Sequence, residues 1–326
     1  MITGEKILIT GVSGLVALPI ARYLAEHNEV WGLARFGLVD DRSGALVTNP
    51  QTREEVEALG IRTVAVDLEH PDLSEVPDDV TYVLHLAHTR LGSQFHRAVQ
   101  VNAVGAGHVL AHCRRAKAAL VVSSTAVYSV NDDPWHVFTE DDDIGRSFAP
   151  WAPSSPPAKV SLEAVACFCA EAFSLPTIVM RLNTLYGPMG ALPVEHLDAI
   201  SKGEPVRIWA LPYPHSLIHI GDMCDQLEPL LGAASIPANI VNWCGDEVVT
   251  VQEWCDFAGE LAGRPAKIEL MEVPGVARGN ISSNAKRLVI TGPCRRQWRE
   301  EFRRLYAERH GSPPTRLEGQ QDGGTR

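Results

Sequence analysis

The sequence predicts an α/β protein built on a doubly wound parallel sheet, with a smaller C-terminal lobe. Two observations lead to this fold class. Short apolar runs alternate with amphipathic helical segments as far as residue 182, and a glycine-rich turn follows the first apolar run. Helical crossovers between strands imply parallel pairing with helices on both faces of the sheet. The composition agrees, because 45% apolar and 21% charged residues exclude a disordered, collagen-like or coiled-coil chain.

Hydrophobic periodicity predicts the elements in order. Residues 6–10 form a short apolar run, residues 14–26 carry apolar side chains at helical spacing, and residues 29–35 are strand-like again, which predicts a βαβ unit. The pattern then predicts a helix over 53–59, strands over 63–66 and 81–86, a helix over 94–115, a strand over 119–124, a helix over 158–173, strands over 177–182, 206–208, 217–220 and 240–242, and a helix over 251–262.

The later part of the chain is irregular, with frequent prolines and short strand-like pieces. We therefore expect a first domain over residues 1–187, to which residues 222–262 return. Residues 188–221 and 263–310 are expected to form a smaller substrate-binding lobe. Residues 311–326 are polar and rich in glycine and proline, which predicts a disordered tail.

Charge and cysteine content exclude several classes of function. Lys plus Arg total 29 against 40 Asp plus Glu, and the net charge of −11 disfavours binding of nucleic acid. Seven cysteines without a CxxC pair predict neither a disulfide framework nor a zinc site, so no metal is expected. Because the chain shows no signal peptide and no run of about 18 apolar residues, we expect a cytoplasmic protein without a membrane partner.

The segment TGVSGLVA lies between the first predicted strand and the first predicted helix. In this context Gly11 permits a tight turn, and Gly14 lets the backbone approach a pyrophosphate that the positive end of the helix attracts. Ser13, Leu15 and Val16 complete the predicted cofactor-binding turn. By itself the segment is also compatible with a plain link between a strand and a helix.

Further motifs follow in order: Asp67-Leu68, His85-Leu86-Ala87, Asn102, SSTAVY at residues 123–128 and RLNTLYGP at residues 181–188. With the TGxxGxxA turn, this series resembles the extended, epimerase/dehydratase-like branch of the short-chain dehydrogenase/reductase superfamily. The resemblance implies a Rossmann-type dinucleotide-binding domain in which Asp67, Leu68, Ala87 and Ser123 contact the cofactor. From the residues alone, Asp67 is also compatible with a carboxylate that closes a turn.

The end of the second predicted strand bears on the choice of cofactor. NAD sites usually place a carboxylate there for the ribose 2′-hydroxyl, whereas this chain has Arg35. A guanidinium suits a 2′-phosphate. We therefore predict NADP(H) as the cofactor, with NAD(H) as the alternative.

The resemblance also implies a catalytic serine or threonine, a tyrosine and a lysine. Ser124 fits the first role, and Lys159 fits the third, in which it also binds the cofactor ribose. Ser155 stands in the tyrosine position, four residues before Lys159. An alkyl hydroxyl is a far weaker acid than a phenol, and two prolines follow Ser155. We therefore predict that Ser155 caps the helix through the Ala158 N–H and is not the proton donor.

Without the phenol, the proton must come from another group. His88 and Tyr128 follow two predicted strands at their carboxyl ends, where such sheets bind ligands. We take His88 as the third catalytic residue. A phenol on the substrate itself, or solvent, is the other source of the proton.

Members of this branch that lack the tyrosine, which this chain resembles, include ketoreductases of aromatic polyketide pathways. The resemblance therefore implies an NADPH-dependent ketoreductase in antibiotic biosynthesis, with a hydrophobic, aromatic substrate against a wall of Trp135, Phe148, Pro150 and Trp151. Two alternatives stay open: a nucleotide-sugar epimerase or dehydratase, and a cofactor-binding sensor without chemistry. The two long helices that pair subunits in many relatives are predicted here, which allows a homodimer.

Overall fold

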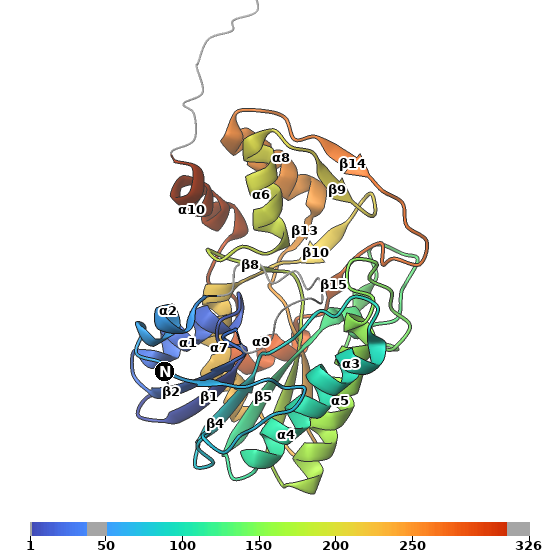
Figure 1. The fold of residues 1–326 in the computed structure, drawn as a ribbon. Helices are drawn as coiled ribbons and strands as arrows, with labels where there is room; N and C mark the ends of the chain where they lie inside the picture. Colours follow the sequence, from blue (N-terminus) through green and yellow to red (C-terminus); the bar gives the residue numbers. More distant parts are fainter. Residues whose placement is uncertain (1, 38–50, 312–326) are drawn as a thin grey trace, which may run out of the picture.

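The computed structural model describes residues 2–37 and 51–311. Its centre is one parallel sheet in the order β12-β7-β5-β4-β1-β2-β3 (Figure 1). The strands are β1 (Lys6–Thr10), β2 (Glu29–Ala34), β3 (Arg62–Ala65), β4 (Tyr82–His85), β5 (Ala118–Ser124), β7 (Thr177–Leu182) and β12 (Asn239–Trp243). This arrangement confirms the predicted α/β fold class.

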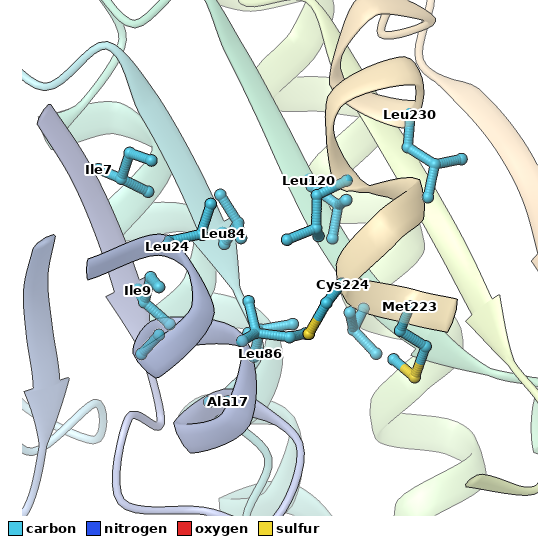
Figure 2. Close-up of a cluster of buried hydrophobic side chains, with 14 of the residues drawn as sticks. Ile7, Ile9, Ala17, Leu24, Leu84, Leu86, Leu120, Met223, Cys224 and Leu230 are labelled. Carbon is cyan, nitrogen blue, oxygen red and sulfur yellow. The ribbon is translucent and has the colours of Figure 1, made fainter. Parts of the chain in front are cut away.

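One face of the sheet is covered by α1 (Ala17–Ala25) and α7 (Ile220–Gly232). The side chains of Ile7 and Ile9 on β1 point to this face and pack with the apolar residues of the two helices. Figure 2 shows Ile7 and Ile9 beside α1, with Leu84 of β4 and Leu120 of β5 between α1 and α7. The neighbouring residue Leu8 belongs to the cluster on the opposite face. Burial on both faces explains why the strands read as continuous apolar runs.

The opposite face is covered by α4 (Gly105–His112) and α5 (Ser155–Ala172). A short helix α3 (Phe95–Val99) and a π-helical turn η1 (Gln100–Val104) lead directly into α4. The helix expected over residues 94–115 is therefore present as three consecutive helical pieces. The helix expected from residue 158 begins three residues earlier, which places Ser155 inside it.

The second lobe packs α6 (Leu192–Lys202), α8 (Val251–Ala262) and α10 (Trp298–His310) around a separate apolar cluster (Figure 1). Two strand pairs complete it: β9 (Val206–Ile208) with β14 (Ile268–Leu270), and β10 (Pro214–Ser216) with β13 (Val248–Thr250). Of the segment expected to return to the first domain, residues 222–262, the part up to the end of β12 does so. Residues 251–262 differ from the expectation, because the apolar face of α8 packs on α6 and not on the sheet.

The remaining short elements are α2 (Arg53–Glu57), η2 (Thr125–Val127), β6 (Val137–Phe138), β8 (Leu185–Tyr186), β11 (Ile218–His219), β15 (Ile281–Ser282) and α9 (Ala285–Thr291). β15 pairs with β6, and α9 packs against α7 and β12, so this part of the expected small lobe lies against the first domain. In the part of the chain that the structure describes, no helix is long and apolar enough to cross a membrane. The predicted tail lies outside the described residues from residue 312 onward.

Candidate active site

The glycine turn lies where the ends of β1 and β4 meet. Gly11 has a φ of 72°, and a Cβ atom added to it would lie 2.8 Å from the Ala87 Cα atom. Only glycine therefore allows these two segments to approach so closely. A Cβ atom on Gly14 would lie 3.1 Å from the Gly11 carbonyl oxygen. Because α1 begins at Ala17, all five predicted turn residues precede the helix.

The start of α1 has the properties of an anion site. Its cap residue is Val16, whose apolar side chain cannot accept a hydrogen bond from the first helical turn. In that turn the Leu18 N–H donates to the Gly14 carbonyl oxygen at 2.9 Å and Pro19 has no N–H, so the Ala17 N–H and the positive end of the helix dipole are what the turn offers to an anion. Together with the close backbone approach at Gly11 and Gly14, this arrangement fits the pyrophosphate of a dinucleotide.

Thr10 joins the carboxyl ends of β1 and β4. Its buried hydroxyl oxygen accepts hydrogen bonds from the N–H groups of Leu86 and Ala87, each at 3.1 Å. The same oxygen lies 3.1 Å from His85 Nδ1. These bonds fix the segment that leads from β4 to His88, and they place Ala87 against the glycine turn, as its predicted cofactor role requires.

Asp67 and Leu68 follow β3. Asp67 Oδ1 accepts a hydrogen bond from the Glu69 N–H at 3.1 Å, so one carboxylate oxygen closes a turn. A Cβ atom on Gly105 would lie 2.5 Å from the Leu68 carbonyl oxygen, so the turn packs on α4 only because this residue is glycine. Arg35 directly follows β2 and is partly exposed. The roles of Asp67, Leu68 and Arg35 toward a cofactor stay predictions.

Lys159 is buried near the end of β5, with 6% of its surface exposed. Its Nζ atom donates to the Val122 carbonyl oxygen at 2.6 Å. Burial lowers the pKa of Lys159 from 10.5 to about 7, although the Glu163 carboxylate opposes this shift. Lys159 is therefore not a solvated surface lysine, and an amine held in this position has the properties of a functional group.

Glu163 forms a buried cluster with Ser123 and Arg181. Its Oε1 atom accepts from the Ser123 hydroxyl at 2.6 Å, and Arg181 donates from Nε to Oε1 at 3.1 Å and from a terminal guanidinium nitrogen to Oε2 at 2.9 Å. The cluster ties β5, α5 and β7 together. Since its hydroxyl is engaged here, any role of Ser123 in cofactor binding rests on its backbone.

Ser124 is the last residue of β5. Its Oγ atom accepts a hydrogen bond from the Ala126 N–H at 3.1 Å and so caps the short helix η2. The hydroxyl proton remains available for donation, and the residue is partly exposed. This geometry is compatible with the predicted role of Ser124 in orienting a substrate oxygen.

The start of α5 differs from the prediction. Ser154 is the N-cap, and the Ala158 N–H donates to the Ser154 carbonyl oxygen at 3.2 Å. Ser155 is the first helical residue, and its Oγ atom lies 2.8 Å from His88 Nε2. The predicted capping role of Ser155 is therefore wrong. The reason is a preceding turn, closed by the Ser155 N–H and the Ala152 carbonyl, which already sets helical geometry at Ser154.

His88 is held in place through the next residue. Asn102 Oδ1 accepts from the Thr89 N–H at 2.7 Å, and Asn102 Nδ2 donates to the Thr89 carbonyl oxygen at 2.9 Å. Burial lowers the pKa of His88 well below 6.5, and the charges of Lys159 and Arg90 add to this effect. The sequence predicted His88 but not its contact with Ser155; the available signal was the position of Ser155 four residues before Lys159.

Tyr128, the other candidate acid, is engaged elsewhere. Its hydroxyl donates to Asn242 Oδ1 at 2.6 Å, and the Arg181 guanidinium carbon lies 4.9 Å from the centre of its ring. Burial raises the pKa of Tyr128 to about 12. Tyr128 is thus a structural residue that links the segment after β5 to β12.

The predicted apolar wall is also arranged differently. Trp151 stacks on Trp209 of the second lobe, with ring centres 5.3 Å apart. Trp135 and Phe148 are exposed. Trp151 therefore contacts the second lobe directly, where its ring already has an aromatic partner.

A sequence profile of the NAD dependent epimerase/dehydratase family matches residues 7–240. The chain belongs to this family. A curated relative, the probable UDP-glucuronate 4-epimerase of Rhizobium meliloti (strain 1021), is 23% identical over 292 residues, which cover 80% of this chain and 83% of the relative. The family carries the Rossmann-type fold that the glycine turn and the motif series predicted.

Solved structures show the same fold over most of the chain. UDP-glucuronic acid 4-epimerase from Bacillus cereus, in complex with UDP-glucuronic acid and NAD, has a TM-score of 0.77 and 19% identity, and the match covers 92% of this chain and 98% of that protein. dTDP-glucose 4,6-dehydratase from Bacillus anthracis in complex with NAD has a TM-score of 0.75 and 18% identity, with coverages of 94% and 97%.

These relatives correct the functional interpretation of the sequence. The expected ketoreductase for an aromatic polyketide is wrong, because the relatives are nucleotide-sugar epimerases and dehydratases. The expected role in antibiotic biosynthesis and the aromatic substrate have no support from them. NADP(H) specificity also has no support there, since the relatives in these complexes bind NAD. The motifs failed to separate the classes because they describe the fold and the cofactor site, which the whole family shares.

Proposed function

We propose that this protein is a nicotinamide-dependent enzyme of nucleotide-sugar metabolism that transiently oxidises one carbinol of a sugar. The observation that carries the proposal is the juxtaposition at one edge of the sheet. The carboxyl ends of β1 and β5 bring the glycine turn and Ser124 to the edge where such sheets bind ligands, and Lys159 on α5 reaches this end of β5 through its bond to the Val122 carbonyl oxygen. The nucleotide sugars named with the relatives supply the substrate class.

The chain's own residues have distinct tasks in this proposal. The turn around Gly11 and Gly14 holds the cofactor pyrophosphate, and Lys159 holds the ribose and adds positive potential near the nicotinamide. Ser124 donates a hydrogen bond to the sugar oxygen at the reacting carbon. A nicotinamide bound here would supply the group that takes up a hydride from that carbon and gives it back. Correct positioning of the two reactants provides much of the rate enhancement.

The preferred cofactor within this proposal is NADP(H). β2 ends without a carboxylate that would repel a 2′-phosphate, and Arg35 provides a guanidinium at this position. NAD(H) is the alternative, since the similar solved structures hold NAD.

A second candidate function is a cofactor-binding sensor without chemistry. Two observations favour it: Ser155 stands in place of a phenol, and the pKa of His88 is lowered. The site therefore lacks the acid or base that a tyrosine provides in an enzyme. Such a sensor needs the glycine turn and Lys159 but no proton-transfer group.

The test is incubation of the purified protein with NAD⁺ or NADP⁺ and, separately, UDP-glucuronate, UDP-glucose and dTDP-glucose. We expect transient nicotinamide reduction and an epimerised or dehydrated sugar with one of them. The variant Ser154→Ala should react like the unmodified protein, because it removes a hydroxyl beside the site that has no hydrogen-bond partner among the described residues. Tight cofactor binding without hydride transfer from any of the three sugars would favour the sensor.

A further inference from the structure

We propose that Ser155 and His88 form a proton relay that replaces the missing phenol, with the Ser155 hydroxyl facing the substrate and His88 Nε2 as the proton acceptor. The inference rests on the proposed function, because it assigns the proton path of the same site. Its basis is the contact between a helix start and a strand end that lie 67 residues apart in sequence.

The geometry suits transfer of a proton. Ser155 Oγ and His88 Nε2 are 2.8 Å apart, within the range in which a hydroxyl donates to an imidazole nitrogen. Ser155 lies four residues before Lys159, one helical turn away on the same side of α5. The pair therefore occupies the position that the motif assigns to the acid, beside the buried amine.

A purely structural role accounts poorly for this pair. The hydroxyl of Ser155 caps no backbone group, because the cap of α5 is the neighbouring Ser154. In the described part of the chain, His88 Nδ1 is buried without a hydrogen-bond partner, an arrangement that destabilises the fold. Asn102 nevertheless clamps the next residue, Thr89, through two hydrogen bonds. The fold thus holds in place an imidazole with a hydrogen-bond partner at Nε2 but not at Nδ1, as is common at functional sites.

The relay conserves both protons and electrons. The substrate carbinol transfers its hydroxyl proton to Ser155 Oγ while the Ser155 proton moves to His88 Nε2. The C–H bond of the carbinol breaks, its hydride passes to the oxidised nicotinamide, and a ketone and an imidazolium form. In the return step the ketone regains the hydride, and the proton moves back through Ser155. His88 ends neutral, so no external oxidant or base is consumed.

The charges around His88 keep its ring neutral before the reaction and favour the return of the proton in the second step. Lys159 on α5, Arg90 after β4 and the buried His85 on β4 all disfavour a positive charge on His88. No carboxylate contributes to the pKa of His88 among the described residues. The ring is therefore neutral before the reaction, a weak base whose acceptance of the proton depends on the short contact with Ser155, and the transient imidazolium is a strong acid that readily returns the proton.

The first test needs no substrate. NMR of isotope-labelled histidine in the NADP⁺-bound protein reports which ring nitrogen of His88 carries the proton. We expect Nε2 to be an unprotonated acceptor, and its signal to move toward that of an unbonded nitrogen in Ser155→Ala but not in Ser154→Ala. A proton on Nε2 in the resting protein would overturn the relay, because Nε2 then has no lone pair to accept the Ser155 proton.

The second test measures hydride transfer in single turnovers with UDP-glucuronate, UDP-glucose and dTDP-glucose. We expect Ser155→Ala and His88→Gln each to lower the rate by about 100- to 10,000-fold, with cofactor affinity unchanged. Because the two residues act as one unit, the double variant should lose little more than either single variant. Unchanged turnover in Ser155→Ala, or fully additive losses, would contradict the relay.

The two tests separate the two proposals. Absence of hydride transfer from all three sugars in the unmodified protein would overturn the proposed function, while the NMR result would still decide whether Nε2 is placed to accept. Hydride transfer in the unmodified protein together with a protonated Nε2 would keep the proposed function and refute the relay.

Discussion

Replacing Lys159 with methionine should stabilise the fold and weaken cofactor binding at the same time. The Lys159 ammonium is buried, and burial lowers its pKa to about 7. Methionine has a similar length and flexibility but carries no charge to desolvate. A gain in stability combined with a loss of binding is typical of a residue kept for function.

The magnitude follows from proton linkage. A pKa lowered from 10.5 to about 7 costs about 4 kcal/mol of unfolding free energy at pH 7, since one unit is worth about 1.4 kcal/mol. At pH 9 the folded lysine is neutral and only the unfolded chain binds the proton, so about 2 kcal/mol remains. The stability advantage of Lys159→Met over the unmodified protein should therefore shrink by about 2 kcal/mol when the pH is raised from 7 to 9. Loss of the bond to the Val122 carbonyl affects both pH values equally.

The assay is urea unfolding of both proteins between pH 7 and pH 9, with a cofactor titration followed by fluorescence. Lys117→Met is the matched control, because Lys117 is exposed and its surface ion pair with Glu5 should give no such pH-dependent difference. A stability difference that does not change with pH would refute the lowered pKa of Lys159. Unchanged cofactor affinity in Lys159→Met would refute its positioning role.

Three further substitutions test other parts of the site. Glu163→Gln should lower the unfolding free energy by about 3–5 kcal/mol in urea denaturation, because it leaves the buried Arg181 without its carboxylate; a loss below about 1 kcal/mol would contradict this. Gly11→Ala should lower the melting temperature more than Gly60→Ala, since both have left-handed φ angles but only Gly11 lacks space for a Cβ atom; equal losses would show that the contact is unimportant. Arg35→Ala should weaken NADPH binding by about 1.5–3 kcal/mol in calorimetric titration and leave NADH binding nearly unchanged, and an equal loss for both would refute NADP(H) preference.

The sequence by itself determined the sheet and the glycine turn after its first strand. Residues 6–10 and 177–182 were recognisable as buried strands, and residues 11–16 as a glycine turn, because each depends on neighbours along the chain. Backbone conformation and hydrophobic periodicity are local properties, so a single segment contains the information. The substrate class was outside this information, because the motifs that carry the fold are common to epimerases and dehydratases.

Only the tertiary structure decided which side chains meet. The Ser-Pro-Pro pattern pointed to a cap at Ser155, whereas the preceding turn makes Ser154 the N-cap, and the Ser155 hydroxyl faces His88. The Ser123 hydroxyl bonds to Glu163, 40 residues away, and α8 packs on α6 and not on the sheet. Such partners lie far apart in sequence. Several alternative contacts of similar free energy are open to each side chain, and only the packing of the folded chain determines which partner it reaches.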